Sequence, residues 1–426
     1  MRHSNQKKSL ENFPVNIQDI NQAYANLKPV VLLSPLQYCE RLSEKYQAKI
    51  FFKREDLQTV RSYKIRGAYN CIAKLTSKEK KQGVVCASAG NHAQGVALAC
   101  KLLKIKGTIF MPNPTPKQKI DRVKAFGNSF IDLVLTGDTF DEASQLAQEH
   151  AQKTLGVFIH PFDDPRVIAG QGTVALEILK QAKTKIDFMV MPIGGGGLAA
   201  GMGVWVKAFS PKTQLVGVEP QGAACMKEAF KHKKTIALKH IDKFVDGAAV
   251  KLAGKNSYKI CSKTLDKLIT VSENHVCTHM IELYQNEGVL AEPAGALSVT
   301  ALDNIAPSIK NKTVVCIISG GNNDISRYSE ILERSLIDRG LKHYFIVEFP
   351  QRPGALRNFL DEALSPNDDI TLFEYIKKNN RESGPALIGV ELGKKENLKI
   401  IKNKIKTLGM NFEELSPHSQ LYKFLI

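Results

Sequence analysis

Three apolar stretches of the chain run directly into glycine-rich turns, and a helical pattern of apolar positions follows each turn. We expect strands at residues 83–87, 187–193 and 313–318, with turns at 88–92, 194–197 and 319–323. Because these strands are apolar throughout, they are typical of a parallel sheet that helices cover on both faces. The pattern predicts an α/β architecture that extends to about residue 335.

The pattern changes from residue 342 onward, where shorter strands alternate with single helices. Strands are expected at residues 343–349, 370–376, 386–392 and 410–415, and helices at 355–364 and 396–408. The resulting order, βαββαβ, is that of a ferredoxin-like domain. We therefore expect a first domain at residues 1–340 and a second at 342–417, with the boundary near Gly340.

Charge and composition narrow the class of protein. The chain has a net charge of +17, but its lysines and arginines are scattered without interleaved aromatic residues, so no nucleic-acid partner is expected. Residues 188–206 are uncharged, yet four consecutive glycines would break a membrane helix, so no membrane partner is expected either. Eight cysteines without a CxxC pair, and a start without the apolar core of a signal peptide, predict a cytoplasmic protein without structural zinc.

Lys64 is a candidate for covalent catalysis. It lies in the segment Ser62-Tyr63-Lys64-Ile65-Arg66-Gly67-Ala68, where Ser62 is placed to cap a helix that opens near the lysine. The positive helix end and the like charges of Arg61 and Arg66 favour loss of the ammonium proton, which a Schiff-base nucleophile requires. The motif is weak by itself, because a lysine in so basic a chain is more often a solvated surface group.

The glycine run from Gly194 to Gly197 is the second candidate. A loop without side chains, placed before a helix, lets backbone N–H groups surround a phosphate. The same run also fits the dinucleotide pattern GxGxxG/A, with Glu219 at about the offset of the ribose-binding acid. A nicotinamide-dependent oxidoreductase is therefore an alternative, although it leaves Lys64 and the other two glycine turns without a role.

Five segments form an ordered set along the chain: Ser62 to Ala68, Ser88-Ala89-Gly90-Asn91-His92, Gly194-Gly195-Gly196-Gly197-Leu198, Glu292-Pro293-Ala294-Gly295-Ala296 and Ser319-Gly320-Gly321-Asn322. Together they closely resemble the threonine and serine dehydratases, which are tryptophan-synthase-β-like, fold-type-II pyridoxal-phosphate enzymes. The match covers nearly the whole chain. It implies a two-lobed catalytic domain whose smaller lobe spans roughly residues 73–165.

The resemblance implies pyridoxal 5′-phosphate as the cofactor and gives each segment a role. Lys64 would bind the cofactor covalently, and its phosphate would be held by Gly194, Gly195, Gly196, Gly197 and Leu198. Asn91 would contact the ring hydroxyl and Ser319 the pyridine nitrogen, while the substrate carboxylate would lie against Ser88, Ala89, Gly90, Asn91 and His92. The implied reaction converts L-threonine to 2-oxobutyrate and ammonia, with L-serine as a slower substrate. A serine dehydratase or a serine racemase of the same fold is an alternative.

Three positions qualify the resemblance. Tyr63 replaces the phenylalanine expected beside the lysine, which keeps a flat ring and adds a hydroxyl. Glu292 could either tune an intermediate or cap the next helix, and the sequence favours neither. In the serine-racemase branch a divalent ion lies near the matches to Glu219 and Ala223, but Cys225 stands here in place of an acidic residue, so no metal is expected.

Histidines at two places in the sequence are candidates for functional groups. His275 and His279 are four residues apart, as metal ligands on one helix face can be. No third ligand is evident in the sequence, so a solvated helix face is the better interpretation. His92 follows the substrate loop, but its expected place at the start of a helix favours a structural hydrogen bond over catalysis.

The segment Phe349-Pro350-Gln351-Arg352-Pro353-Gly354-Ala355-Leu356 resembles the start of an ACT-like domain, as found in biosynthetic threonine dehydratases. In that family the domain binds isoleucine, with valine opposing it. The resemblance implies feedback regulation at Arg352, Pro353, Gly354, Ala355 and Leu356, although a dimerisation module without ligand is an alternative. We expect a homo-oligomer, in the form of a tetramer.

Overall fold

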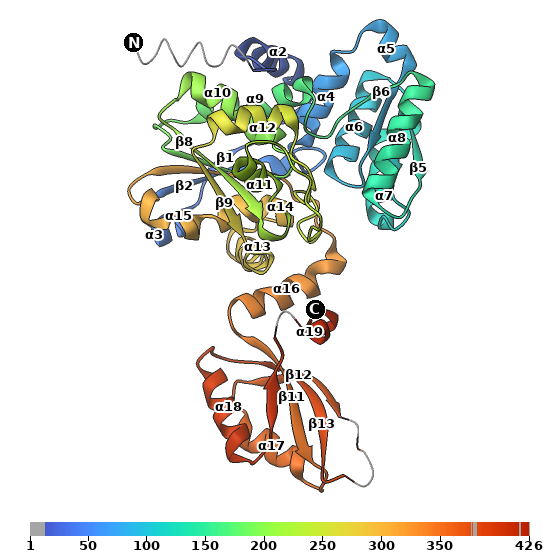
Figure 1. The fold of residues 1–426 in the computed structure, drawn as a ribbon. Helices are drawn as coiled ribbons and strands as arrows, with labels where there is room; N and C mark the ends of the chain where they lie inside the picture. The colour runs from blue at the N-terminus through green and yellow to red at the C-terminus, as the bar shows by residue number, and fades with distance from the viewer. Residues whose placement is uncertain (1–12, 376, 378–380, 417–418, 426) are drawn as a thin grey trace. The chain divides into compact units, whose positions relative to one another are not determined.

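The computed structural model describes residues 13–375, 377, 381–416 and 419–425, and the chain divides into two compact units, residues 1–324 and 325–426 (Figure 1). The strand end expected at residue 376 and the domain end expected at residue 417 lie outside the described residues. The division near Gly340 stays a prediction, as does the extent of the smaller lobe.

The first unit contains a six-stranded sheet with the order β1-β2-β10-β7-β8-β9. Its strands are β1 (Leu36–Tyr38), β2 (Lys49–Arg54), β7 (Phe188–Pro192), β8 (Gln214–Pro220), β9 (Lys267–Val271) and β10 (Thr313–Ile318). β1 pairs antiparallel with β2, and the other neighbours pair in parallel. Apolar side chains of β7 and β10 pack into one core with α9 (Pro165–Gln181) and α10 (Gly197–Phe209), while α14 (Pro293–Thr300) lies on the other side of the sheet (Figure 1).

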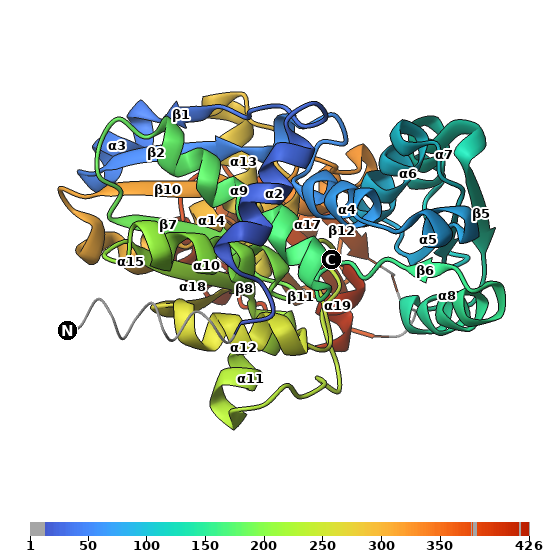
Figure 2. The ribbon, with the colours of Figure 1, turned by 90° about the horizontal axis from the view of Figure 1, so that it is seen from above.

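A second sheet of the same unit forms a separate lobe (Figure 2). Its order is β5-β4-β3-β6, all parallel, with β3 (Val84–Ala87), β4 (Gly107–Met111), β5 (Ile131–Leu135) and β6 (Val157–Phe158). Side chains alternate across β3, so Val84 and Cys86 join a core with α4 (Lys64–Ala73) and α6 (Asn91–Leu103), whereas Val85 and Ala87 face α8 (Phe140–Thr154). The two sheets confirm the two-lobed α/β fold.

Further helices complete the first unit. They are α2 (Ile17–Leu27), α3 (Glu40–Tyr46), α5 (Ser77–Gln82), α7 (Lys117–Gly127), α11 (Cys225–His232), α12 (Lys255–Thr264), α13 (Glu273–Glu287) and α15 (Leu302–Ile309). Within the described ranges, every helix falls short of the length and apolarity that a membrane span requires.

Four buried charged side chains hold α4 against the rest of this unit. The guanidinium of Arg66 donates to both carboxylate oxygens of Glu55 at 2.8 Å, and to those of Glu177 at 2.7 and 2.8 Å. Lys53 Nζ donates to Glu177 Oε2 at 2.7 Å, so two cations face two carboxylates. Because Glu177 belongs to α9 and Lys53 to β2, this network ties α4 to both a helix and a strand of the larger lobe.

The second unit has the expected βαββαβ order. Its elements are β11 (Lys342–Pro350), α17 (Ala355–Ala363), β12 (Asp369–Tyr375), β13 (Ser383–Glu391), α18 (Asn397–Thr407) and β14 (Phe412–Glu414), accompanied by α16 (Tyr328–Asp338) and α19 (Gln420–Leu425). The strands pair antiparallel in the order β12-β13-β11-β14. Phe345, Phe349 and Phe359 belong to the core between the sheet and its two helices. The ferredoxin-like prediction is confirmed.

Replacement of Arg66 tests the ionic network. Arg66→Met leaves Glu55 and Glu177 short of a buried cation, so we expect the free energy of unfolding to fall by about 3–5 kcal/mol. Unfolding in urea can be followed through the fluorescence of Trp205, the single tryptophan, which lies in the core of this unit. As a control, Lys185→Met breaks the exposed pair with Asp187 and should change stability by less than about 1 kcal/mol. Equal effects of the two substitutions would contradict a stabilising role for the network.

Candidate active site

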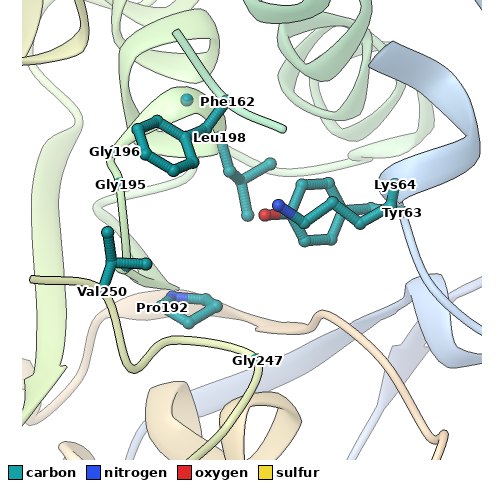
Figure 3. Close-up of a pocket in the computed structure, with 11 residues that line it drawn as sticks. Tyr63, Lys64, Phe162, Pro192, Gly195, Gly196, Leu198, Gly247 and Val250 are labelled. Atoms are coloured by element: carbon teal, nitrogen blue, oxygen red, sulfur yellow. The ribbon is translucent and has the colours of Figure 1, made fainter. Parts of the chain in front are cut away.

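The side chains of Lys64 and Tyr63 point into a pocket of the first unit (Figure 3). Lys64 is the first residue of α4, and its Nζ donates to the carbonyl oxygen of Pro161 at 3.2 Å. Phe162 and Val250 line the pocket, together with the glycine loop on the side opposite Lys64 (Figure 3). The amine therefore faces a confined space rather than bulk solvent.

Burial lowers the pKa of Lys64 to about 8, and the negative charge of Glu292 partly opposes this shift. The expected contribution of like charges is wrong for Arg66, because that guanidinium is neutralised by two buried carboxylates. The expected cap is also wrong. The N-cap of α4 is Tyr63, without a side-chain cap bond, and the buried hydroxyl of Ser62 has no hydrogen-bond partner.

The glycine loop follows β7 and leads into α10, which begins at Gly197. Gly196 has φ of +94°, a conformation that side chains disfavour. At Gly195 a Cβ would lie 2.2 Å from the ring of Phe162, so only glycine fits this close approach. The first N–H groups of α10 have no partner within their own helix, and the loop leaves them accessible from the pocket.

The turn after β10 is joined directly to the lysine segment. The backbone N–H of Tyr63 donates to the carbonyl oxygen of Ser319 at 3.1 Å, and Ser62 forms an isolated antiparallel bridge with Gly320. The buried hydroxyl of Ser319 donates to the carbonyl oxygen of Ala294 at 3.3 Å. The segments around Tyr63 and Ser319, which are far apart in the sequence, thus meet just before the start of α4.

The predicted substrate loop lies at the end of β3 and the start of α6. Within it the N–H of Gly90 donates to Ser88 Oγ at 3.2 Å. Asn91, the first residue of α6, donates through Nδ2 to Glu292 Oε1 at 2.6 Å and accepts from Asn322 Nδ2 at 2.7 Å. These two bonds connect the smaller lobe to the turns of the larger lobe, and neither contact was predicted from the sequence.

The contacts of Glu292 show that its side chain does not cap the next helix. It occupies the N-cap position of α14, but its carboxylate makes no cap bond and accepts from Asn91 instead. Burial raises the pKa of Glu292 to about 7, and the charge of Asp246 adds to this rise, while the bond from Asn91 opposes it. A carboxyl of this kind can exchange a proton near neutral pH.

Two histidines near Lys64, His92 and His160, have a pKa below the ordinary value of histidine. Burial and the nearby charge of Lys64 lower the pKa of His92 to about 3, and its Nε2 contacts the carbonyl oxygen of Ile159 at 2.9 Å. Burial also lowers the pKa of His160, whose Nδ1 accepts the backbone N–H groups of Phe162 and Asp163. Residues 160–163 carry no motif from which their place could be predicted, because they meet the site through the carbonyl oxygen of Pro161 and the ring of Phe162.

Glu219 does not offer a free carboxylate, as a ribose-binding acid would. It is buried, and its two carboxylate oxygens accept the backbone N–H groups of Met226 and Lys227 at 2.7 and 2.8 Å. Burial raises the pKa of Glu219 to about 7, and the two backbone N–H groups oppose this rise. Its oxygens are used to hold the start of α11.

The groups around this pocket fit a phosphate-bearing aldehyde with an aromatic ring. The amine of Lys64 in the pocket suits a carbonyl, and the side-chain-free helix start at Gly197 suits a phosphate. The residues between them, among which are Phe162, Leu198 and Val250, offer an apolar surface to a ring.

Comparison with known families identifies both units. Residues 27–320 match the model described as "Pyridoxal-phosphate dependent enzyme", and residues 333–425 match the "C-terminal regulatory domain of Threonine dehydratase". The chain belongs to the threonine dehydratases. Its cofactor is therefore pyridoxal 5′-phosphate, and the nicotinamide alternative is wrong.

Individual relatives agree with this family. The biosynthetic L-threonine dehydratase IlvA of Bacillus subtilis is 52% identical over 98% of this chain and 99% of that protein, and that of Mycobacterium leprae is 51% identical over 97% of each. Among solved structures, threonine deaminase isoform 2 of Solanum lycopersicum is 38% identical with a TM-score of 0.71, covering 75% of this chain and 94% of that one. A maize serine racemase is 30% identical with a TM-score of 0.71, covering 76% and 99%.

The pKa of Glu292 gives a prediction for stability against pH. The carboxyl binds its proton more tightly in the folded protein, at a pKa of about 7 against an ordinary value of 4.5, so its ionisation costs stability as pH rises between these values. Glu292→Gln removes this cost. We therefore expect the Tm of this variant, relative to the wild type, to increase as pH rises through that window. The exposed control Glu44→Gln should show a constant difference, and parallel profiles for Glu292→Gln and Glu44→Gln would contradict burial of an ionising carboxyl.

Proposed function

We propose that this protein converts L-threonine to 2-oxobutyrate and ammonia as the first step of isoleucine biosynthesis, and that it accepts L-serine more slowly. The observation that carries the proposal is the amine of Lys64 in a pocket opposite the glycine loop, in a chain that matches a biosynthetic threonine dehydratase over 98% of its length. The match of residues 333–425 to a threonine dehydratase regulatory domain favours this reaction over serine racemisation.

The residues of the pocket divide the binding of the cofactor between them. We propose that Lys64 binds its carbonyl carbon and that Gly194, Gly195, Gly196, Gly197 and Leu198 hold its phosphate. Asn91 is proposed to meet the ring hydroxyl, and Ser319 the pyridine nitrogen. The bond between Tyr63 and Ser319 supports this division, because it fixes the lysine segment against the serine turn.

The bound cofactor supplies an electron sink that makes the α-proton of the substrate acidic. The amine of Lys64 is suited to take up that proton, because its pKa of about 8 lies close to neutral pH. His92 and His160 stay neutral beside it, so neither adds a positive charge to the pocket. A serine at the position of Ser319, unlike a carboxylate, would not hold a pyridine nitrogen protonated, which favours loss of the β-hydroxyl over a long-lived carbanion.

The substrate carboxylate is proposed to lie against Ser88, Ala89, Gly90, Asn91 and His92. The start of α6 is within this loop, so its first N–H groups and the helix dipole favour an anion there. The side chain of His92 holds the loop through the carbonyl oxygen of Ile159, so His92 is proposed to meet the carboxylate through its backbone.

Isoleucine is proposed as the regulator, with valine opposing it, at Arg352, Pro353, Gly354, Ala355 and Leu356. Gly354 has φ of +88° and stands at the N-cap of α17, Ala355 is buried, and the side chain of Leu356 is exposed. An exposed aliphatic side chain next to a helix start offers an apolar contact, and the positive end of the helix favours the carboxylate of an amino-acid ligand.

The proposal also covers the cellular location and the oligomeric state of the enzyme. A cytoplasmic location is supported by the eight cysteines, all of which are free and buried. Assembly into a homo-oligomer, expected to be a tetramer, would let the regulatory unit bias the conformation of the catalytic unit. Light scattering after size exclusion measures that assembly.

Replacement of Lys64 tests the proposed reaction. Lys64→Ala should lower the formation of 2-oxo acid from L-threonine by at least about 1000-fold, since the proton-transfer group and the covalent link are both lost. The variant should also lose the yellow absorbance of the holoenzyme. Lys74→Ala, at the C-cap of the same helix, is the control and should keep both. Racemisation of serine without formation of 2-oxobutyrate from threonine would contradict the proposal.

Sensitivity to isoleucine tests the regulatory part separately. We expect isoleucine to inhibit the wild type. Inhibition of Leu356→Ala should require a several-fold higher concentration of isoleucine, because the variant lacks the aliphatic side chain that is proposed to contact the ligand. Ile400→Ala removes an aliphatic side chain of similar exposure from α18 and should keep the wild-type response. Wild-type turnover that isoleucine leaves unchanged would reject the effector and leave the catalytic proposal intact.

A further inference from the structure

The structure supplies the third ligand that the sequence did not reveal for His275 and His279. Both histidines project from α13 toward Asp303 of α15. Their Nε2 atoms lie 3.1 and 3.0 Å from the same oxygen, Asp303 Oδ2. The three ligand atoms lie within 4.8 Å of one another, and they form the one group of three such side chains among the residues that the structure describes.

We propose that His275, His279 and Asp303 bind a divalent transition-metal ion of the Zn²⁺ class. Two imidazoles and one carboxylate are the ligands that Zn²⁺ commonly takes, and three protein ligands leave a fourth position for water. The ion would replace two hydrogen bonds to Asp303 Oδ2 with bonds from both rings and the carboxylate to one centre. It would then join α13 to α15 as a structural link.

A second observation supports an ion rather than hydrogen bonds alone. The side chain of His279 is 2% exposed, and its Nδ1 has no hydrogen-bond partner. Glu282 Oε2, also buried without a hydrogen bond, lies 3.8 Å from that Nδ1. An ion on Nε2 leaves the proton of a neutral imidazole on Nδ1, where it faces Glu282. Metal-bound histidines commonly donate their other N–H to a carboxylate in this way.

The neighbouring groups leave Asp303 Oδ2 available as a metal ligand. The hydroxyl of Tyr46 donates to Asp303 Oδ1 at 2.7 Å, and Lys45 Nζ lies 3.4 Å from the same atom. Both groups therefore occupy Oδ1 and leave Oδ2 directed at the two histidines. Arg41, 3.7 Å from Glu282, balances the charge of the second carboxylate. Figure 1 shows α13 and α15 in the larger lobe of the first unit.

Metal binding to the full-length, tag-free holoenzyme tests the proposal directly. Titration with ZnCl₂ in a calorimeter should show saturable binding of one ion per chain, and an equimolar amount should raise the Tm. Co²⁺ should give the intense visible absorption of a four-coordinate site rather than the weak bands of the hydrated ion. Because protons compete for the imidazoles, affinity should fall as pH is lowered from about 7.5 to about 5.5.

Three variants decide whether these residues are the ligands. Loss of an outer partner of a metal ligand costs about 10–100-fold in affinity, so loss of a ligand in His275→Gln or Asp303→Asn should cost at least about 100-fold. The partly exposed position of His275 keeps its variant foldable, and retained threonine turnover verifies the fold. His232→Ala removes a helical histidine that also lies beside a glutamate, and should bind as the wild type does. Wild-type binding no tighter than that of His275→Gln, or equal losses in all three variants, would overturn the proposal.

Discussion

The buried interaction of Arg66 with Glu55 and Glu177 is the constraint on which the active site depends. Arg66 lies two residues after Lys64 on the same helix, and its side chain is inaccessible to solvent. Its bonds hold α4 against α9 and against Glu55, which directly follows β2, and the bond from Lys53 to Glu177 adds β2 to the network. Buried charged side chains carry a large free-energy cost of desolvation, and only one arrangement of these four satisfies all of their hydrogen bonds. The orientation of Lys64 follows from that arrangement.

The same burial sets the protonation of the catalytic groups. Removal from water favours the neutral forms of Lys64, His92 and Glu292 alike, although the first two are bases and the last is an acid. Near neutral pH the region around Lys64 therefore holds an amine and a carboxyl close to their points of proton exchange, beside a histidine that does not exchange. The sequence analysis attributed the low pKa of the lysine to the helix end and to the charges of Arg61 and Arg66, and the fold neutralises the charge of Arg66 with two carboxylates.

Local patterns were sufficient for the fold and insufficient for the contacts within the site. The continuous apolar strands, the glycine turns and the βαββαβ order can each be recognised from short segments of sequence. The architecture of both units was therefore predicted correctly. The partners of Asn91, in contrast, lie more than a hundred residues away, at Glu292 and Asn322, and only the paired lobes bring them together. Asp303 was missed as a neighbour of His279 because it lies on another helix, α15, and the sequence does not show how α13 and α15 pack. The roles given to single cofactor-binding residues stay predictions.

The backbone bond between Tyr63 and Ser319 has a consequence for how the enzyme is made. During synthesis the lysine leaves the ribosome early, whereas the strand that carries the serine turn emerges only when most of the first unit has been translated. Until β10 is inserted between β2 and β7, the lysine segment has neither its partner strand edge nor its partner turn. A nascent chain that is truncated before this strand cannot assemble the vitamin B6 pocket, so incomplete products stay catalytically silent.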